Sequence, residues 1–367
     1  MGRMVEANSV RYGLVGTGMM AVEHIHNLAI TPGAIVTAIA DPVAESLGWA
    51  RAALGNDADS VSSFANSAEL AASCLCDAVI VASPNYTHRS VLEPLFDAGV
   101  HILCEKPLAT TIDDARWVAE RAKSHPAVFW TAMEYRYMPP AAEFIAQVHA
   151  NRIGKLQMLS IREHRFPFLV KVGDWNRFSA NTGGTMVEKC CHFFDLMRLI
   201  TGSEAVRVYC SGAMDVNHLD ENYGGKTPDI IDNSFTTVDF ANGVRAMLDL
   251  SMFADGAEDQ EEIVAVGDKA RLDCRIPSGD LIYYPRTGRR SAKTPERVHV
   301  PVDEAALKAG SHHGSTWYAH QKFNAAVRGQ GRVEVTADDG LRAVAIGMAA
   351  EISAKEKRAV NMSELGF

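Results

Sequence analysis

Residues 10–21 read VRYGLVGTGMMA, and this stretch decides the fold of the first part of the chain. Its first six residues are a short, largely apolar run, which predicts a strand, and a helical pattern continues from Met19 to about Ile30. The turn between them follows the pattern GxGxxA. Gly16 permits a tight turn, and Gly18 has no side chain that could block a pyrophosphate at the helix N-terminus. The stretch therefore predicts the phosphate-binding turn of a dinucleotide site.

Further apolar runs repeat this alternation of strand and helix as far as about residue 134. Thr111 opens one of the intervening helices, with Asp114 three residues later, which is the spacing of an N-terminal cap. Near-continuous apolar strands separated by helices are typical of a parallel sheet covered on both faces. Residues 1–134 are therefore predicted to form an α/β domain, a doubly wound parallel sheet of the Rossmann type. The predicted strands are residues 35–41, 77–83, 101–105 and 128–133, and one predicted helix is 112–123.

The second predicted strand ends in Asp41, which Pro42 and Val43 follow. A carboxylate at this place would accept hydrogen bonds from the adenosine ribose hydroxyls and would repel a 2′-phosphate. The two residues after it offer no cation for such a phosphate. NAD is therefore favoured over NADP.

After about residue 135 the strands become longer and alternate apolar with polar residues, and Ala241-Asn242-Gly243 predicts a hairpin. Helices at roughly 185–200, 315–328 and 338–355 would cover one face of the resulting sheet. Residues 135–367 are therefore predicted to form a second α/β domain with a large open, mostly antiparallel sheet. Its last helix, about 338–355, is expected to pack back toward the first domain, and residues 285–301 are expected to be an exposed loop. The long strands are predicted at 156–166, 206–216, 233–252 and 261–276.

Composition excludes several classes of function. With 36 basic and 45 acidic residues the net charge is −9, which disfavours general binding to nucleic acid. The start lacks a long apolar stretch, and no run approaches the length of a membrane span. Seven cysteines without a CxxC pair predict free thiols in a reducing cytosol and give no support to a metal site. We therefore expect a cytoplasmic enzyme.

Glu105-Lys106-Pro107 lies at the end of a predicted parallel strand, where ligands bind in open α/β sheets. A lysine at this edge can reach both a nicotinamide and a substrate hydroxyl. A surface lysine before a turn proline is the alternative interpretation.

Over nearly its whole length the chain resembles the glucose–fructose oxidoreductase, inositol dehydrogenase and MocA (Gfo/Idh/MocA) family. The segments that carry the resemblance are GLVGTGMMAVEH, AIADP, SPNYTHRSVLEPLFDAGVHILCEKPLA and GGTMVEKCCHFFDLMRLITG. The resemblance implies NAD(P)-linked chemistry at a hydroxyl-bearing carbon of sugars or polyols. It also implies a homodimer or homotetramer formed through the C-terminal sheet. The expected cofactor-binding residues are Gly16, Gly18, Met19, Met20, Asp41, Ser83, Asn85, His88, Glu105 and Lys106.

Glu188, Lys189, His192 and Asp195 would share one face of a helix, because spacings of three, four and seven residues bring side chains together. By the resemblance, His192 matches the active-site histidine and Lys106 the lysine of the EKP motif. Glu188 stands where relatives commonly carry aspartate, and Lys189 where a small or apolar residue is usual. The expected catalytic residues are Lys106, His192, Glu188 and Lys189, with Glu188 and Asp195 orienting or charge-balancing His192 and Lys189. The neighbouring Cys190 and Cys191 are interpreted as packing residues.

Cationic side chains gather in the sequence around the expected mouth of this site. A solvated basic face is the alternative, but in a chain of net charge −9 the cluster favours an anionic substrate. Tyr135 and Arg136 resemble the substrate-facing crossover segment of the family. Ser311 to Ser315 begin a helix and could approach the substrate or cap that helix through Ser315. The expected substrate-binding residues are Tyr135, Arg136, Arg162, His164, Arg165, Lys171, Trp175, Arg177, Asp195 and His313.

The leading hypothesis is NAD-dependent oxidation of a secondary alcohol on a sugar or sugar derivative that carries negative charge. His192 would take the hydroxyl proton and Lys106 would stabilise the alkoxide. The alternative is a redox-neutral, NAD-dependent glycosidase that acts on an anionic glycoside such as a sulfo- or carboxy-sugar. That path needs an additional acid–base group, which Glu188–Lys189 or Tyr135 could supply. A non-catalytic NAD-binding regulator is disfavoured because Lys106 and His192 are both present.

Overall fold

The computed structural model of the protein describes residues 9–288 and 294–367. The expected lack of an apolar leader concerns residues 1–8, and part of the expected 285–301 loop falls on residues 289–293, so both lie outside the described residues. The chain folds into two compact units. The first contains Met1–Glu134, Val170–Trp175 and Asp303–Val344, and the second contains Tyr135–Leu169, Asn176–Val302 and Ala345–Phe367.

The first unit is built on a six-stranded sheet with the order β3-β2-β1-β4-β5-β6, in which every neighbouring pair is parallel. The predicted parallel sheet is confirmed. Strand β3 escapes prediction because its three residues, SSF, form no apolar run. The strand order reverses between β1 and β4, and a reversal of this kind opens a crevice at the carboxyl ends of the strands. The strands are β1 (Val10–Val15), β2 (Ala34–Ala40), β3 (Ser62–Phe64), β4 (Ala78–Val81), β5 (His101–Glu105) and β6 (Phe129–Ala132).

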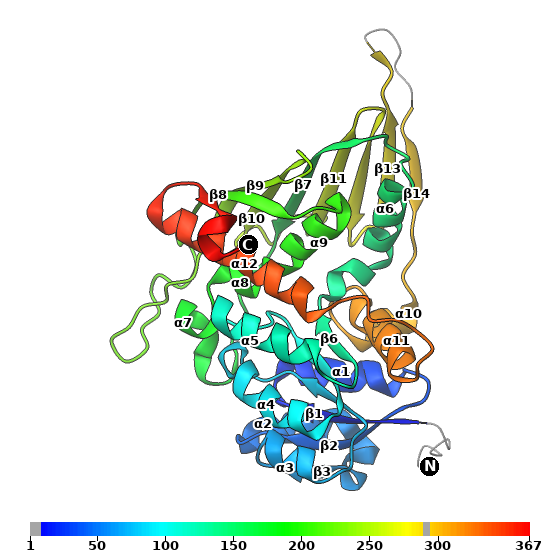
Figure 1. Ribbon diagram of the computed structural model, residues 1–367, viewed down its shortest axis with the longest axis vertical. Helices are drawn as coiled ribbons and strands as arrows, with labels where there is room; N and C mark the ends of the chain where they lie inside the picture. The colour runs from blue at the N-terminus through cyan, green and yellow to red at the C-terminus, as the bar shows by residue number, and fades with distance from the viewer. Residues whose placement is uncertain (1–8, 289–293) are drawn as a thin grey trace. The chain divides into compact units, whose positions relative to one another are not determined.

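Helices connect these strands and cover the sheet (Figure 1). The hydroxyl of Thr111 accepts the backbone N–H of Asp114 at 3.1 Å, as the capping pattern predicted. The helix predicted at 315–328 was expected to cover the second sheet, and this expectation is wrong, because α11 belongs to the first unit. There α11 packs against α1, and the hydroxyl of Tyr12 in the sheet donates to Asn324 of α11. The helices of this unit are α1 (Met19–Ala29), α2 (Ala44–Leu54), α3 (Ser67–Ala72), α4 (His88–Ala98), α5 (Ile112–Lys123), α10 (Glu304–Ala309) and α11 (Ser315–Val327).

The second unit is built on a nine-stranded sheet with the order β14-β13-β12-β11-β7-β10-β9-β8-β15. Only the pairing of β7 with β10 is parallel, so the predicted mostly antiparallel sheet is confirmed. Residues 261–276 form two strands, although the sequence suggested one. The strands are β7 (Leu156–His164), β8 (Ala205–Ala213), β9 (Asn233–Phe240), β10 (Arg245–Ser251), β11 (Glu261–Gly267), β12 (Ala270–Ile276), β13 (Asp280–Pro285), β14 (Glu296–His299) and β15 (Val360–Asn361).

The expectation of a loop over 285–301 is wrong at β14, which pairs with β13 at the edge of the sheet. All four residues of β14 are exposed, so no apolar alternation marks this edge strand in the sequence.

Helices α6 (Pro139–His149) and α9 (Cys191–Thr201) cover one face of the sheet (Figure 1) and bury Phe144 and Phe194 with Leu159 and Ile161 of β7. The predicted helix over 185–200 is interrupted, because α8 (Thr185–Glu188) ends before Lys189 and α9 begins at Cys191. The other two helices that contribute to this unit are α7 (Ser179–Thr182) and α12 (Ala337–Glu356), and the boundary between the units falls within α12.

No helix within the described residues is both long enough and apolar enough to cross a membrane.

Candidate active site

The turn after β1 has the geometry of a phosphate-binding turn. Gly16 has a φ of +82°, and a Cβ there would lie 2.3 Å from the Cα of Ser83. Only glycine fits that place. Gly18 precedes α1, has no heavy atom within 4 Å of the position of a Cβ, and caps the helix without any side chain from the described residues. The start of α1, where Met19 and Met20 lie, is therefore open to an anion.

Asp41 connects this turn to the end of β2. Its carboxylate oxygens accept the backbone N–H groups of Thr17 and Val43, each at 2.8 Å. Each carboxylate oxygen keeps a second lone pair, so the group can still accept hydrogen bonds from a ribose diol.

The loop after β4 supplies an unused donor. Asn85 is buried, and its Nδ2 has no hydrogen-bond partner among the described residues. An orphaned buried donor is costly unless a ligand or water satisfies it. Ser83 accepts a hydrogen bond from the hydroxyl of Thr87 at 2.8 Å, which holds the loop.

His88 requires a correction. It is fully buried, and its ring nitrogens lie 3.2 Å from the carbonyl oxygen of Ser83 and 3.4 Å from that of Leu108. Burial lowers the pKa of this ring. His88 therefore supports the loop from within and does not present its ring to a cofactor.

Glu105 anchors the segment that carries Lys106. Its Oε1 lies 3.0 Å from Nε2 of His24, and its Oε2 accepts the backbone N–H of Lys106 at 3.1 Å. Burial opposes ionisation, yet the hydrogen bond and charge of His24 hold the pKa of Glu105 below its usual value. Glu105 thereby fixes the backbone of Lys106 at the carboxyl edge of the sheet.

Glu134 is a residue of this edge that the sequence analysis missed. It is buried directly after β6, and burial together with the charge of Glu105 raises its pKa to about 7, while His312 and Lys106 oppose that rise. A carboxyl group with such a pKa can hold or release a proton near neutral pH. Its position after the strand predicted at 128–133 is the signal that could have identified it.

The segment before α11 is held by α1. Glu23 accepts from the hydroxyl of Thr316 at 2.8 Å and lies at the same distance from the ring of His312. Gly314 caps α11, so the suggested cap by Ser315 is wrong, while His313 is half-buried with a φ of +51°.

These residues of the first unit fit a dinucleotide. The open start of α1 at Gly18 offers a place for a pyrophosphate. The side-chain amide N–H of Asn85 can donate to a hydrogen-bond acceptor of the cofactor. The carboxylate of Asp41 can accept from a ribose.

In the second unit, His192 and Lys189 both contact Tyr135. The rings of His192 and Tyr135 stack with centroids 4.0 Å apart and planes 6° apart. Nζ of Lys189 donates to the phenolic oxygen of Tyr135 at 2.5 Å and lies 2.8 Å from Oε1 of Glu163. Burial lowers the pKa of Lys189, although the charge of Glu163 opposes this. All four side chains are buried.

Asp195 and Glu188 occupy different surroundings from those expected. Asp195 forms a buried two-point pair with Arg136, through Nε at 3.0 Å and through Nη2. This pair fixes the segment of Arg136, and the charges of Asp195 and Arg136 compensate each other. Glu188 is buried at the end of α8. Glu163 is the carboxylate that balances Lys189.

Two carboxylates of the sheet were missed by the sequence analysis. Glu163 of β7 and Glu261 of β11 both face the covered side of the sheet. Burial and the charge of Glu163 raise the pKa of Glu261 to about 8, so Glu261 is protonated at neutral pH. The signal was present in the strand alternation, because Glu163 follows the inward-facing Leu159 and Ile161.

The residues of the predicted cationic cluster do not lie together in the structure. Arg162 and His164 point away from Lys189 to the other face of the sheet, where they pair with Glu262 at 3.2 Å and Asp249 at 3.3 Å. Successive residues of a strand alternate between its faces, which is why neighbours in sequence separate here. The expectation that these two residues line the site is therefore corrected.

The other predicted cations also have partners. Arg177 is buried and pairs with Glu221 at 2.8 Å, so it braces a loop. Arg165 lies 3.7 Å from Glu163. In the first unit, Nζ of Lys171 lies 4.5 Å above the ring of Trp175, which contacts Tyr86 edge to face.

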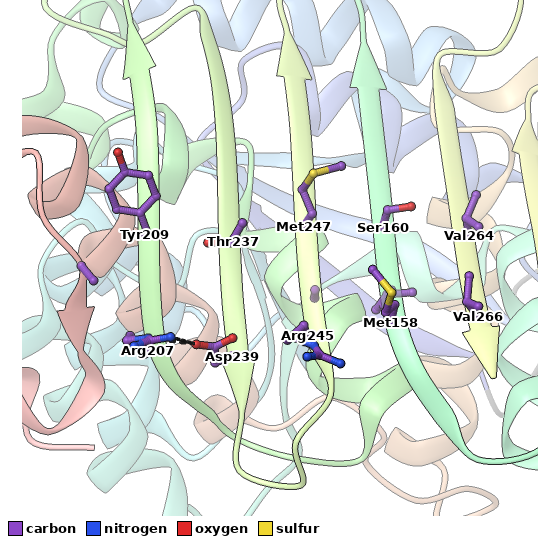
Figure 2. Close-up of a pocket in the computed structure, with 13 residues that line it drawn as sticks. Met158, Ser160, Arg207, Tyr209, Thr237, Asp239, Arg245, Met247, Val264 and Val266 are labelled. Carbon is purple, nitrogen blue, oxygen red and sulfur yellow. Dashed lines mark hydrogen bonds and ion pairs between the residues drawn. The ribbon is translucent and has the colours of Figure 1, made fainter. Parts of the chain in front are cut away.

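The outward face of the sheet carries a shallow hollow of about 690 Å³ (Figure 2). Tyr209 of β8 and Met247 of β10 lie at the same level across it, and Met158 of β7 lies at the level of Arg245. This apolar surface is exposed within the single chain.

Two family models match the chain. Residues 10–133 match the NAD-binding Rossmann fold of the GFO_IDH_MocA oxidoreductase family, and residues 145–362 match its C-terminal alpha/beta domain. The chain is 26% identical over 359 residues to the myo-inositol 2-dehydrogenase of Thermotoga maritima, covering 97% of this chain and 99% of that protein. It is 23% identical over 362 residues to an inositol 2-dehydrogenase of Rhizobium meliloti, covering 97% and 100%.

Among solved structures, levoglucosan dehydrogenase in complex with NADH and levoglucosan superposes with a TM-score of 0.83 at 19% identity, covering 96% of this chain and 99% of that one. At this identity the likeness establishes the fold alone. The family models carry the assignment, because together they match both parts of the chain. The chain belongs to the Gfo/Idh/MocA oxidoreductase family, with an NAD-binding Rossmann domain followed by the family's C-terminal α/β domain.

Proposed function

We propose that this protein oxidises a secondary alcohol of a sugar or sugar derivative, with NAD as its cofactor. The observation that carries the proposal is the place of Lys106, which Glu105 fixes at the same sheet edge as the open glycine turn and Asp41. Relatives named for inositol oxidation support a polyol or sugar as the substrate class.

In the proposed reaction His192 accepts the hydroxyl proton of the substrate, a task that suits histidine because its ordinary pKa lies near neutrality. Lys106 stabilises the developing alkoxide by its charge and by hydrogen bonding. NAD, when bound, accepts the hydride from the carbinol carbon. Glu134 is buried just after β6 with a pKa of about 7, and this pKa suits a group that exchanges a proton during the reaction.

The cofactor preference is assigned to Asp41. Its carboxylate faces the turn at 2.8 Å from the N–H of Thr17, where it can accept from a ribose diol and repel a 2′-phosphate. Asp41→Ala is expected to weaken NAD binding and to narrow the discrimination against NADP, as measured by titration with each cofactor. Wild-type protein that binds NADP as tightly as NAD would contradict the assignment.

The experiment that tests the proposed function is a substrate panel with two simultaneous readouts. Myo-inositol, levoglucosan, neutral sugars, sugar acids and aryl glycosides of each are incubated with NAD, and NADH formation and aglycone release are followed together. Net NADH formation supports the dehydrogenase. If no member of the panel gives NADH or aglycone, the proposal is wrong.

A redox-neutral glycosidase is the second candidate. It is favoured by one observation, the contact of Nζ of Lys189 with the phenolic oxygen of Tyr135, whose ring stacks on His192. Aglycone release that requires NAD but gives no net NADH would identify this activity.

The negative charge on the substrate also remains a prediction. Four of the expected cations, namely Arg162, His164, Arg165 and Arg177, pair with carboxylates, which reduces the support for an anionic substrate. Equal turnover of a sugar acid and its neutral parent would contradict it.

We further propose a homodimer or homotetramer formed through the outward face of the C-terminal sheet. The support is the exposure of the large apolar side chains of Met158, Tyr209 and Met247 on this face (Figure 2). Met247→Asp is expected to shift the mass in solution toward the monomer, as measured by light scattering. An unchanged mass, or a wild-type monomer, would contradict the proposal.

A reducing cytoplasm is the proposed location, supported by seven cysteines that remain thiols, six of them buried.

A further inference from the structure

A buried lysine supports the phenol of Tyr135. Nζ of Lys189 is 2.5 Å from the phenolic oxygen and 2.8 Å from Oε1 of Glu163. The side chain of Lys189 is 5% exposed and that of Glu163 is fully buried. Electrostatic interactions are stronger in such surroundings than in water, so the ammonium group acts strongly on the atoms it contacts.

The direction of this hydrogen bond decides its chemical effect. An ammonium group has only donors, so the phenolic oxygen of Tyr135 is the acceptor. A donor and a positive charge at that oxygen favour the phenolate over the phenol.

Tyr12 in the first unit shows the opposite arrangement. Its phenol is equally buried, but there the O–H donates to Oδ1 of Asn324 at 3.1 Å. Burial raises the pKa of Tyr12 well above its usual value. The fold therefore contains one phenol held in its protonated form and another whose oxygen receives an ammonium donor.

The charged groups around Lys189 come from three elements. Glu163 of β7 and Arg165 just after it lie on one side, Glu261 of β11 on another, and the rings of His192 and Phe193 belong to α9. Glu261 is neutral at pH 7 because its pKa is about 8. The buried thiol of Cys190 has a pKa raised well above its usual value, chiefly by burial. Glu163 is the carboxylate that forms the ion pair with Lys189, at 2.8 Å.

We propose that Tyr135 is a further acid–base group of the site and that Lys189 is a positioning residue that favours its phenolate. The proposal rests on the sugar oxidation assigned to His192 above. It also gives Lys189 a role in the reaction that differs from binding an anionic substrate.

The second acid–base group extends the chemistry that the site can perform. Oxidation of a secondary alcohol releases one proton, which His192 accepts. The phenolate can then take a proton from the carbon next to the new carbonyl group. In that step an O–H bond forms on Tyr135, the C–H electron pair becomes an enolate, and a leaving group on the following carbon departs with its bonding pair. The phenol returns the proton later, so the group is regenerated.

The test is a spectroscopic titration of Tyr135 in the whole protein, without sugar or cofactor. The phenolate absorbance of Tyr135→Phe is subtracted from that of the wild type. We expect Tyr135 to ionise about one to three pH units below free tyrosine, which is the usual effect of an opposite charge in contact. Lys189→Met should raise the midpoint by a similar amount, and Lys189→Arg should restore most of the change. Tyr284→Phe, a matched change on β13, should leave the Tyr135 transition in place.

A midpoint at or above that of free tyrosine would overturn the proposal, as would a midpoint that Lys189→Met leaves unchanged. Glu163→Gln provides an independent check if Lys189→Met does not fold. Removing that negative charge should lower the midpoint, and a rise or no change would also overturn the proposal.

A second measurement separates this inference from the proposed function. A glycoside that reduces NAD is incubated in deuterated water and the recovered sugar is analysed for deuterium next to the oxidised carbon. Incorporation that Tyr135→Phe reduces more strongly than NADH formation supports the role of Tyr135. Oxidation without incorporation overturns that role, whereas a lack of any oxidation overturns the proposed function and leaves the titration to decide on Tyr135.

Discussion

Arg162 and Glu163 are adjacent in β7, and their charged side chains lie on opposite faces of the sheet. Glu163 faces inward, is fully buried and lies 2.8 Å from Nζ of Lys189. Arg162 faces outward and pairs with Glu262 at 3.2 Å, with both side chains 30% exposed. Consecutive charged residues of a strand therefore divide into two groups on opposite faces of the sheet, because side chains alternate between the faces. Charge density in the sequence of a strand does not by itself indicate a charged site.

The two faces also differ in what their ion pairs do. Exposed pairs on the outward face are screened by water and contribute little to stability. In the buried pairs on the inward side, each charge interacts with a fixed partner in place of water. Removing one partner therefore leaves the other charge buried and unpaired. The inward face therefore holds groups with shifted pKa values, such as Lys189 and Glu261.

The strongest test of this comparison uses His192 of α9, on the covered side of the sheet, and His164 of β7, on its outward face. His192→Ala should lower turnover by about 10²–10⁴-fold, because a general base is lost. His164→Ala, on the outward face, should leave turnover near the wild-type value. Rates of NADH formation on a sugar found with the panel measure both effects. A large loss for His164→Ala would mean that the outward face takes part in the reaction.

Removing one carboxylate from each face compares the two ion pairs. Glu163→Ala should lower the free energy of unfolding by about 3–5 kcal/mol, because it leaves Lys189 buried without its partner. Glu262→Ala should cost at most about 1 kcal/mol. Denaturant unfolding gives both values, and Glu163→Ala is also measured in a Glu261→Gln background, because loss of the Glu163 charge lowers the pKa of Glu261 and would let it replace Glu163. Equal costs would contradict the distinction between the faces.

The pH dependence of stability should report the inward face through Glu261. Its pKa is raised from 4.5 to about 8, so folding favours the protonated form. The stabilisation is fully present below about pH 4.5 and is lost as the pH rises toward about 8, by at most about 1.4 kcal/mol for each pH unit between these values. Glu261→Gln should flatten this slope, while Glu262→Gln should preserve it. The slope is measured by unfolding the three proteins across this range.

The smallest expected effect belongs to the pair of His164 and Asp249 on the outward face. Asp249→Asn should change the free energy of unfolding by less than about 1 kcal/mol, and added salt should abolish the difference. Asp195→Asn, which breaks the buried pair with Arg136, should keep its larger effect in salt. Insensitivity of Asp249→Asn to salt would indicate that this part of the outward face is shielded from water.

Local patterns were sufficient to predict most of the parallel sheet of the first unit, whereas Asp303–Val344 were expected in the second domain. The strand of residues 10–15, the glycine turn and the cap of Thr111 are each determined by a few neighbouring residues, and the structure has them as predicted. The exposed β3 and the edge strand β14 could not be predicted, since neither has an apolar face to mark it. The interruption before α9 also has no local breaker such as proline.

The site was less predictable because its partners are distant in the sequence. Helical spacing brought Lys189 and His192 together correctly, but the groups that define their chemistry are Tyr135 and Glu163. Asp195 illustrates the same difficulty, since its partner is Arg136, 59 residues away.

The sequence by itself determined the family and the cofactor class, because short motifs encode turns and strand ends directly, and it indicated the lysine and the histidine that the proposed reaction uses. Only the tertiary structure decided which charges are neutralised and which are exposed. The pairing of β7 with β10 and β11 buries Glu163 beneath α9, and this burial makes Lys189 a partner of Tyr135. Burial depends on what packs against a residue from elsewhere in the chain, and no local pattern contains that information.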